Sequence, residues 1–244
     1  MGQWRYCSDY IVNVVAAARL LVRRAAECIS KVLSSAQTVT EILEVGLAIF
    51  SRAPVPSQSK RRLIPALGAQ GAAALQARMT QHVVSEAVRA NLAEVTLWCH
   101  PDTRHAHFEM LKENYGIELK VQTEGDLGTK MSNALSSILR SNQCALLVGS
   151  DCPGLDAGVL REAAYELSTN DAVLGAAKDG GYVLIGVRAN DATLFEGMPW
   201  GTARVLQRTR ERMQRLGWRW HELGPFTDID RPDDLAELGS DWFE

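Results

Sequence analysis

An aspartate follows directly after an apolar run in this 244-residue chain. The segment LLVGSDCPGL covers Leu146 to Leu155, and its apolar half is typical of a buried strand that ends just before Asp151. In open α/β sheets the ligand crevice lies beyond the carboxyl ends of the strands, so this carboxylate would face a ligand. One or two carboxylates together with substrate phosphates form a typical Mg²⁺ or Mn²⁺ site. The competing interpretation is that Asp151 caps a following helix.

A second acidic segment, DIDRPDD, covers residues 228–234. Asp228 and Asp230 occupy alternate positions, so both side chains would lie on the same side of an extended segment. Either carboxylate could complete a metal site with Asp151. Alternatively, Asp230 caps a short helix that begins near Pro232, while the acidic residues after it complement the helix dipole. The residues alone leave capping and coordination open.

A dense basic cluster follows the first expected strand. It lies in RAPVPSQSKRRL, which begins at Arg52 and contains Lys60, Arg61 and Arg62. Ammonium and guanidinium groups on such a loop can clamp a diphosphate or a triphosphate. Adjacent basic residues are usually just solvated, but doubly wound folds commonly have their phosphate loop after strand one. This position favours the phosphate-binding interpretation.

Two glycine-bearing turns with acidic residues follow further strands. One is EGDLG, with Gly125 and Asp126, and the other is KDGGY, with Asp179, Gly180 and Gly181. Glycine lets the backbone approach a sugar or a nucleotide closely. Such glycine pairs also mark ordinary turns, so their shared position at strand ends is the informative feature. We expect both turns to border the ligand.

Composition argues against several functional classes. Lys and Arg number 26 against 29 Asp and Glu, a net charge of -3, so no overall basic field exists to hold nucleic acid or an anionic membrane. Five scattered cysteines without a CxxC pair argue against a disulfide framework and a zinc finger, and favour a reducing cytoplasm. No segment reaches the roughly 18 uncharged apolar residues that span a bilayer, so stable membrane insertion is not expected.

The elements that must position these residues alternate along the chain. Strand patterns alternate with helical patterns, which predicts βαβ units and a mostly parallel sheet. The turn around Asp179 leaves no room for a crossover helix, so the sheet should be mixed. Strands are expected at 45–50, 95–99, 119–122, 144–149, 172–177, 182–187 and 218–223, and helices at 71–90, 103–114, 127–139, 155–167, 203–216 and 232–238.

A further helix is predicted over residues 10–33, where apolar residues keep helical spacing and charged residues follow an i, i+4 stripe. We interpret residues 1–44 as an N-terminal helical extension and residues 45–244 as the functional domain. The extension is basic and alanine-rich, but it lacks a cleavage site and carries acidic residues, so a packed or loosely attached helix is favoured over a targeting segment. A lineage-specific extension and an overlong gene model are both compatible with it.

From about Val45 to Leu238 the chain resembles the DUF2064 family, whose members look like GT-A nucleotide-diphospho-sugar transferases. The resemblance implies a Rossmann-like, three-layer α/β/α fold with a mostly parallel mixed sheet. SKRRL and SDCP also resemble phospholactate guanylyltransferases, and the DIDRPDDL segment resembles molybdopterin cytidylyltransferases. Six ordered motifs carry the family resemblance: AIFSRAPVPSQSKRRLIPALG, EGDLGTKM, LLVGSDCPGL, AAKDGGYVLIG, LFEGMPWGTARVL and DIDRPDDL.

The resemblance implies roles for individual residues. Lys60 and Arg62 would meet the phosphates, Asp151 would carry the divalent metal, and Asp230 would lie near the same metal. Four positions depart from the family pattern. Ser57 stands where the family usually has glycine, Arg61 where threonine is common, Lys130 where arginine is common, and Gly201 where PWST-type members have serine.

The leading hypothesis is a metal-dependent, glycosyltransferase-like enzyme that transfers a sugar from a nucleotide diphosphate to a small-molecule acceptor. Lys60, Asp151 and Asp179 would act in catalysis, Asp179 on the acceptor side. The alternative is a nucleotidyltransferase that uses the same residues on a nucleoside triphosphate and releases pyrophosphate. A non-catalytic nucleotide-binding protein is the third hypothesis. The expected nucleotide-binding residues are Arg52, Lys60, Arg62, Gly125, Asp126, Gly180 and Gly181.

Overall fold

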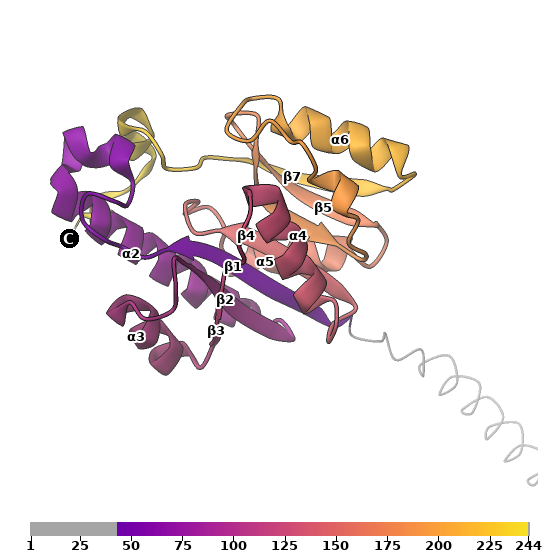
Figure 1. Cartoon of the computed structure of the whole chain (residues 1–244), viewed down its shortest axis with the longest axis horizontal. Coiled ribbons are helices and arrows are strands. Elements are labelled where there is room, and N and C mark those ends of the chain that lie inside the picture. Colours follow the sequence, from indigo (N-terminus) through magenta and orange to yellow (C-terminus); the bar gives the residue numbers. More distant parts are fainter. Residues whose placement is uncertain (1–42, 244) are drawn as a thin grey trace, which may run out of the picture. The chain divides into compact units, whose positions relative to one another are not determined.

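A seven-stranded sheet in the order β3-β2-β1-β4-β6-β5-β7 lies at the centre of the described domain. The structure is a computed structural model that describes residues 43–243, so the predicted helix over residues 10–33 lies outside the described residues. Figure 1 shows the sheet and its helices. The strands are β1 (Val45–Arg52), β2 (Glu94–His100), β3 (Glu118–Val121), β4 (Cys144–Gly149), β5 (Ala172–Ala177), β6 (Tyr182–Val187) and β7 (Trp220–Phe226).

The sheet is mixed, as the sequence predicts. Strand β1 pairs in parallel with β2 and β4, and β2 pairs in parallel with β3. Strand β6 runs antiparallel to both β4 and β5, and β7 is parallel to β5. Only four residues, 178–181, separate β5 from β6. A parallel connection needs a crossover of a dozen or more residues, so this short turn forces the reversal.

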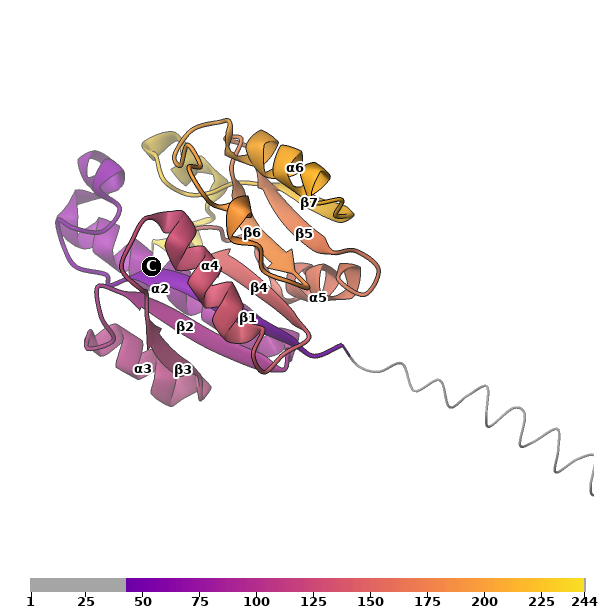
Figure 2. The ribbon, with the colours of Figure 1, turned by 45° about the vertical axis from the view of Figure 1, so that its right-hand side comes forward.

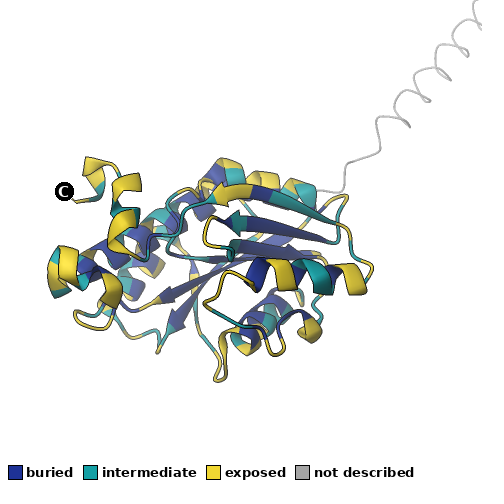
Figure 3. Cartoon of the chain, turned by 90° about the horizontal axis from the view of Figure 1, so that it is seen from above, coloured by how far each residue is buried: buried dark blue, intermediate teal, exposed yellow. Residues whose placement is uncertain are grey.

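Helices cover both faces of the sheet. Alternate strand residues point to opposite faces, so Leu47 and Ile49 pack with α2 (Ile64–Ala90), α3 (Ala106–Tyr115) and α5 (Ala157–Glu166). Ala48 and Phe50 pack on the other face with α4 (Leu127–Ile138) and α6 (Val205–Arg215). Figure 2 shows α4 and α6 in front of the sheet. In Figure 3 the strands are largely buried between helices with exposed outer faces. The predicted three-layer α/β/α fold is confirmed.

Some element boundaries differ from the sequence prediction for local reasons. Helix α2 begins at Ile64 rather than 71 because a preceding turn continues into it across a kink at Gly68. Helix α5 begins at Ala157 rather than 155, since the Asp156 carboxylate accepts a hydrogen bond from Val159 N at 2.8 Å. The predicted helix at 232–238 is a 3₁₀ helix, Pro232–Glu237. Further 3₁₀ turns are η1 (Arg61–Leu63), η2 (Ala192–Leu194) and η4 (Ser240–Trp242).

The segment after β7 packs on α2 and thereby reaches the carboxyl ends of the strands. Ile229 is buried in a small apolar cluster with Leu63, Leu75 and Met79. Its backbone N–H donates to the carbonyl oxygen of Asp151 at 2.9 Å. These contacts bring residues 228–230 beside the end of β4. Among residues 43–243, none of the helices is both long and apolar enough to cross a membrane.

Candidate active site

Two adjoining pockets lie at the carboxyl ends of β1 and β4. Their volumes are about 290 and 380 Å³. Four residues line both pockets, namely Phe50, Leu127, Gly149 and Asp151. Asp151 therefore lies at the boundary between the two pockets, beyond the end of its strand, where open α/β sheets bind ligands.

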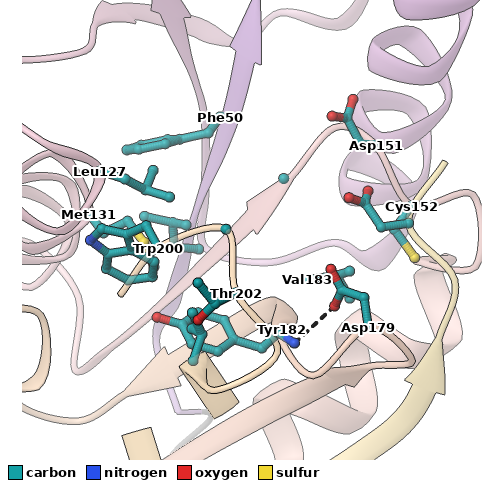
Figure 4. A pocket seen from close by; sticks show the side chains of 16 residues that line it. Phe50, Leu127, Met131, Asp151, Cys152, Asp179, Tyr182, Val183, Trp200 and Thr202 are labelled. Atoms are coloured by element: carbon teal, nitrogen blue, oxygen red, sulfur yellow. Dashed lines mark hydrogen bonds between the residues drawn. The ribbon is translucent and has the colours of Figure 1, made fainter. Parts of the chain in front are cut away.

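The first pocket, here called the acidic pocket, combines three carboxylates with an apolar wall. Its acidic residues are Asp151, Asp179 and Asp228. Figure 4 shows Asp151 and Asp179 on one side, opposite an apolar group. No Lys, Arg or His lines this pocket in the described part of the chain. The apolar group consists of Phe50, Leu127, Met131 and Trp200.

The second pocket, here called the basic pocket, is polar and positively charged. Arg52, His100 and Lys130 line it, together with Gln122 and other polar residues close to Asp151. Burial lowers the pKa of His100, and the nearby charges of Lys130 and Arg52 lower it further. The neutral imidazole and the two nearby cations provide hydrogen-bond donors for a polyanion such as a diphosphate.

Lys60 contacts the metal-site candidate directly. Its side chain is only 3% exposed, and its Nζ lies 3.0 Å from Asp151 Oδ1. The same ammonium donates a hydrogen bond to the carbonyl oxygen of Ile229 at 2.7 Å. Lys60 has a left-handed backbone with φ 41°. The preceding loop is fixed because Ser59 Oγ donates to Ala53 O at 2.8 Å. The predicted basic loop thus brings one buried cation to Asp151.

The other half of the basic cluster takes a different position. The Arg62 guanidinium pairs with the Asp230 carboxylate; the Arg62 side chain is largely exposed and that of Asp230 is partly exposed. Neither residue lines either of the two pockets. Arg61 is exposed as well. Lys60 and Arg62, which the resemblance links as phosphate ligands, therefore pair with different carboxylates, and Lys60 likewise lines neither pocket.

Asp228, rather than Asp230, lies with Asp151. Burial raises the pKa of Asp228 to about 7, and the negative charge of Asp151 adds to this effect, while Lys60 opposes it. The two aspartates at 228 and 230 diverge because the chain turns into η3, where Asp234 Oδ2 accepts hydrogen bonds from the backbone N–H groups of Asp230 and Arg231. Alternation holds only along an extended segment, and this one ends there.

Neither of the competing capping interpretations holds. Asp156 is the N-cap of α5, so Asp151 does not cap this helix. Asp234 supplies the carboxylate at the start of η3, so Asp230 does not cap it. In residues 43–243, no group of three or more His, Cys, Asp or Glu side chains is arranged to hold a metal ion. Asp151 and Asp228 would need phosphate oxygens to complete a coordination shell, which is the usual situation for Mg²⁺.

The two glycine-bearing turns have different positions. Gly181 lines the acidic pocket, and its N–H donates to Asp179 Oδ1 at 2.9 Å. Gly180 has φ 87°, and a Cβ there would lie 2.4 Å from the carbonyl oxygen of Ala203. The positive φ and the close carbonyl oxygen at residue 180 require glycine.

The other turn does not reach the two pockets. Asp126 is the N-cap of α4 and accepts a hydrogen bond from Thr129 N at 2.8 Å. Neither Gly125 nor Asp126 lines the acidic or the basic pocket. The cap instead fixes the start of α4, which carries Leu127 and Lys130 into the pockets.

A buried polar network behind Asp151 is absent from the sequence-based predictions. Gln76 Nε2 donates to Ser150 Oγ at 3.0 Å, and Ser51 Oγ lies 2.7 Å from Thr80 Oγ1. Ser150 Oγ also donates to Ser51 Oγ at 3.3 Å. Buried polar groups that satisfy one another hold a site rigid. Gln76 and Thr80 lie four residues apart on the buried face of α2. In the sequence these two polar residues interrupt an apolar stripe, and that interruption could have indicated the network.

Cys152 lines the acidic pocket but lacks the properties of a nucleophile. Its side chain belongs to the apolar core, and burial raises the pKa of its thiol to about 11. A thiol is reactive as the thiolate, so Cys152 stays protonated and inert at neutral pH. Tyr182 and Trp200 line the same pocket with their rings edge to face, 6.4 Å apart.

Solved structures of several transferases have a fold similar to that of this chain. A candidate nucleotide-diphospho-sugar transferase from Desulfovibrio desulfuricans G20 is 29% identical, with a TM-score of 0.70 over 82% of this chain and 87% of that chain. A nucleotidyl transferase from Methanothermobacter thermautotroptrophicus is 15% identical, with a TM-score of 0.56 over 82% of this chain and 97% of that chain. Glucosyl-3-phosphoglycerate synthase from Mycobacterium tuberculosis is 10% identical, with a TM-score of 0.51 over 80% and 75%.

No curated protein sequence matches this chain. Residues 83–202 match the model of a family described as "Uncharacterized protein conserved in bacteria (DUF2064)". The matched segment contains the ends of β2, β3, β4 and β5 and most of the acidic pocket. The resemblance drawn from the motifs is confirmed: residues 83–202 match the DUF2064 family model, and the chain has a GT-A-like α/β fold.

Proposed function

We propose that residues 45–244 form a metal-dependent, glycosyltransferase-like enzyme that acts on a nucleotide diphosphate sugar. The observation that carries this proposal is the position of Asp151 between a basic and an acidic pocket, with the buried ammonium of Lys60 at 3.0 Å. A diphosphate fits the basic side, and the bond that breaks would then lie at the boundary.

The similar proteins support this assignment. The Desulfovibrio protein is described as a candidate nucleotide-diphospho-sugar transferase. The Mycobacterium structure holds Mn²⁺, UDP and glucosyl-3-phosphoglycerate on the same kind of fold. Fold likeness alone does not establish a reaction, so the proposal rests on the charges and positions of this chain's own residues.

Arg52 and Lys130 are the proposed phosphate ligands. Both line the basic pocket, and their side chains can donate to phosphate oxygens without first breaking an ion pair with a carboxylate in the described part of the chain. Lys60 would hold the Asp151 carboxylate in place and add positive charge beside the diphosphate. Its low exposure keeps that charge largely unscreened.

Asp151 and Asp228 are the proposed metal ligands. The raised pKa of Asp228 reflects its burial and the nearby Asp151 charge, so a buried and a partly exposed carboxylate lie close enough to interact. Such a pair suits Mg²⁺ or Mn²⁺, with phosphate oxygens completing the shell. When bound, the cation would neutralise negative charge on the departing diphosphate.

Asp179 is the proposed acceptor-side carboxylate. Its Oδ1 accepts the Gly181 N–H, which orients the carboxylate at the edge of the acidic pocket. In the transfer step the acceptor hydroxyl oxygen bonds to the anomeric carbon, the bond from that carbon to the diphosphate oxygen breaks, and the hydroxyl proton passes to Asp179. The products are the glycosylated acceptor and a nucleoside diphosphate.

The test is a thermal-shift screen of nucleotide sugars and nucleoside triphosphates, with and without Mg²⁺ or Mn²⁺, followed by product analysis of the compounds that bind. Release of a nucleoside diphosphate from a nucleotide sugar is expected. Release of pyrophosphate from a triphosphate would instead assign nucleotidyl transfer, which the same residues could serve.

A matched pair of variants makes this test specific. Asp151→Asn should abolish the metal-dependent part of the thermal shift, because it removes the charge at the pocket boundary. Asp156→Asn is the control, since asparagine caps a helix as well as aspartate does and residue 156 lines neither pocket. Equal metal-dependent shifts in both variants would refute the role of Asp151.

A further inference from the structure

We propose that the acceptor is a small, uncharged polyhydroxyl compound with one apolar face, and that phosphorylated or carboxylated acceptors are rejected. This inference rests on the proposed function and concerns the acidic pocket.

The charge of the acidic pocket is the first argument. Its only charged lining residues in the described part of the chain are Asp151, Asp179 and Asp228. A divalent cation on two of these would leave the Asp179 charge uncompensated. An anion entering beside it would be repelled, and more strongly where water is excluded.

The nearby cations do not offset this repulsion, because each has another partner. Lys178 belongs to the same turn as Asp179, but its Nζ lies 3.2 Å from Glu237 Oε1. The Lys60 ammonium is shared between Asp151 and the carbonyl oxygen of Ile229. Arg52 and Lys130 line the basic pocket, where the donor phosphates are proposed to lie.

The shape of the acidic pocket is the second argument. Figure 4 shows Asp179 facing an apolar wall that includes Phe50, Met131 and Trp200. Hydroxyl groups can donate to the carboxylates while the C–H face of a ring or chain packs on the aromatic side chains. The volume of about 290 Å³ is at the lower end of small-molecule sites, about 300–1,000 Å³. A compact acceptor with one polar face and one apolar face fits both the volume and the two walls of this pocket.

The test compares matched acceptor pairs that share a carbon skeleton. Suitable probes are glycerol and glycerol 3-phosphate, glucose and glucose 6-phosphate, and inositol and inositol 1-phosphate. Binding to the full chain with Mg²⁺ is measured by ligand-observed NMR, and transfer is measured as acceptor-stimulated release of nucleoside diphosphate. For each pair in which binding is detected, the neutral compound should bind at least tenfold more tightly than its phosphate ester. Equal or better binding of the phosphate esters, or no binding by any neutral member, overturns the proposal.

Two variants of one turn identify the cause of the selectivity. Asp179→Asn keeps an oxygen that can accept the Gly181 N–H, so the turn should be retained while its charge is lost. The preference for the neutral member should then fall at least roughly fivefold, because repulsion of the ester is relieved. Lys178→Gln, outside the pocket, should leave that preference unchanged. An unchanged preference in Asp179→Asn would overturn the charge argument.

The proposed function and this inference can fail separately. If no nucleotide sugar shows a metal-dependent thermal shift, the proposed function fails. If the donor binds and releases nucleoside diphosphate but phosphate esters are the better acceptors, only the inference about the acceptor fails.

Discussion

Replacing Asp228 with asparagine should stabilise the metal-free protein, and more so at alkaline pH. Burial and the charge of Asp151 raise the pKa of the Asp228 carboxyl from its ordinary 3.8 to about 7 in the folded state. The folded protein therefore binds this proton more tightly than the unfolded chain does. Stability is highest where Asp228 is protonated in both states, and it is lost as the pH rises from 3.8 towards 7.

The magnitude follows from the two pKa values. Each pKa unit corresponds to about 1.4 kcal/mol, so ionisation of Asp228 costs the folded state about 4 kcal/mol above pH 7. Only part of that cost is present at pH 5. The stability difference between Asp228→Asn and the wild type should therefore grow by about 2–3 kcal/mol between pH 5 and pH 8.

Urea unfolding in EDTA at pH 5 and pH 8 measures this difference. Asp230→Asn is the matched control, because its carboxylate is partly exposed and pairs with Arg62 at the surface. An exposed pair of this kind contributes about 0–1 kcal/mol, so the control should show little change with pH. In addition, Mn²⁺ should stabilise the wild type at pH 8 but not Asp228→Asn.

The outcome that refutes the reasoning is a stability difference that does not change with pH. It would mean that Asp228 is ionised at neutral pH at no cost, with Asp151 too distant to repel it. A lower stability of Asp228→Asn at pH 8 would likewise show that the carboxylate is stabilised by a cationic partner such as Lys60, and the metal assignment would lose its main support.

Three further substitutions test other parts of the structure. Ser57→Gly should raise the free energy of unfolding by about 0.5–1 kcal/mol in urea, because residue 57 has a left-handed φ of 66°, and a loss of stability would contradict this. Gly180→Ala should lower it by about 1–3 kcal/mol, since the added Cβ would meet the Ala203 carbonyl; a neutral effect would show that the turn can shift. Gln76→Leu should weaken Mg²⁺-dependent nucleotide binding roughly tenfold by titration, whereas the exposed Gln81→Leu on the same helix should not, and equal effects would count against the buried network.

The fold was predictable because its signals are local. Strands β5 and β6 match the predicted residues 172–177 and 182–187, since both are short apolar runs bounded by turn residues. The turn between them excludes a crossover, so the change of strand direction was predictable too. The position of Asp151 followed from the same logic, because a residue after a buried strand lies at the ligand edge.

The prediction for the metal-site partner depended on contacts that a pattern does not contain. Asp228 and Asp230 are equivalent by alternation, and the resemblance implied Asp230. The structure distinguishes them through the hydrogen bonds that start η3 and through Arg62, which pairs with Asp230. These groups are polar surface residues whose partners are chosen by the final packing of the segment on α2.

The basic loop is the clearest case in which the sequence did not predict the partners of individual side chains. Lys60, Arg61 and Arg62 are consecutive, yet only Lys60 is buried against Asp151. A left-handed residue followed directly by a 3₁₀ turn sends neighbouring side chains in different directions. The ammonium of Lys60 is then held by a carbonyl oxygen 169 positions away in the chain, at Ile229. A run of like charges can therefore suggest a phosphate loop, but the partners that the fold brings to each side chain decide where each cation lies, and for this reason we propose Arg52 and Lys130, rather than Arg62, as the phosphate ligands.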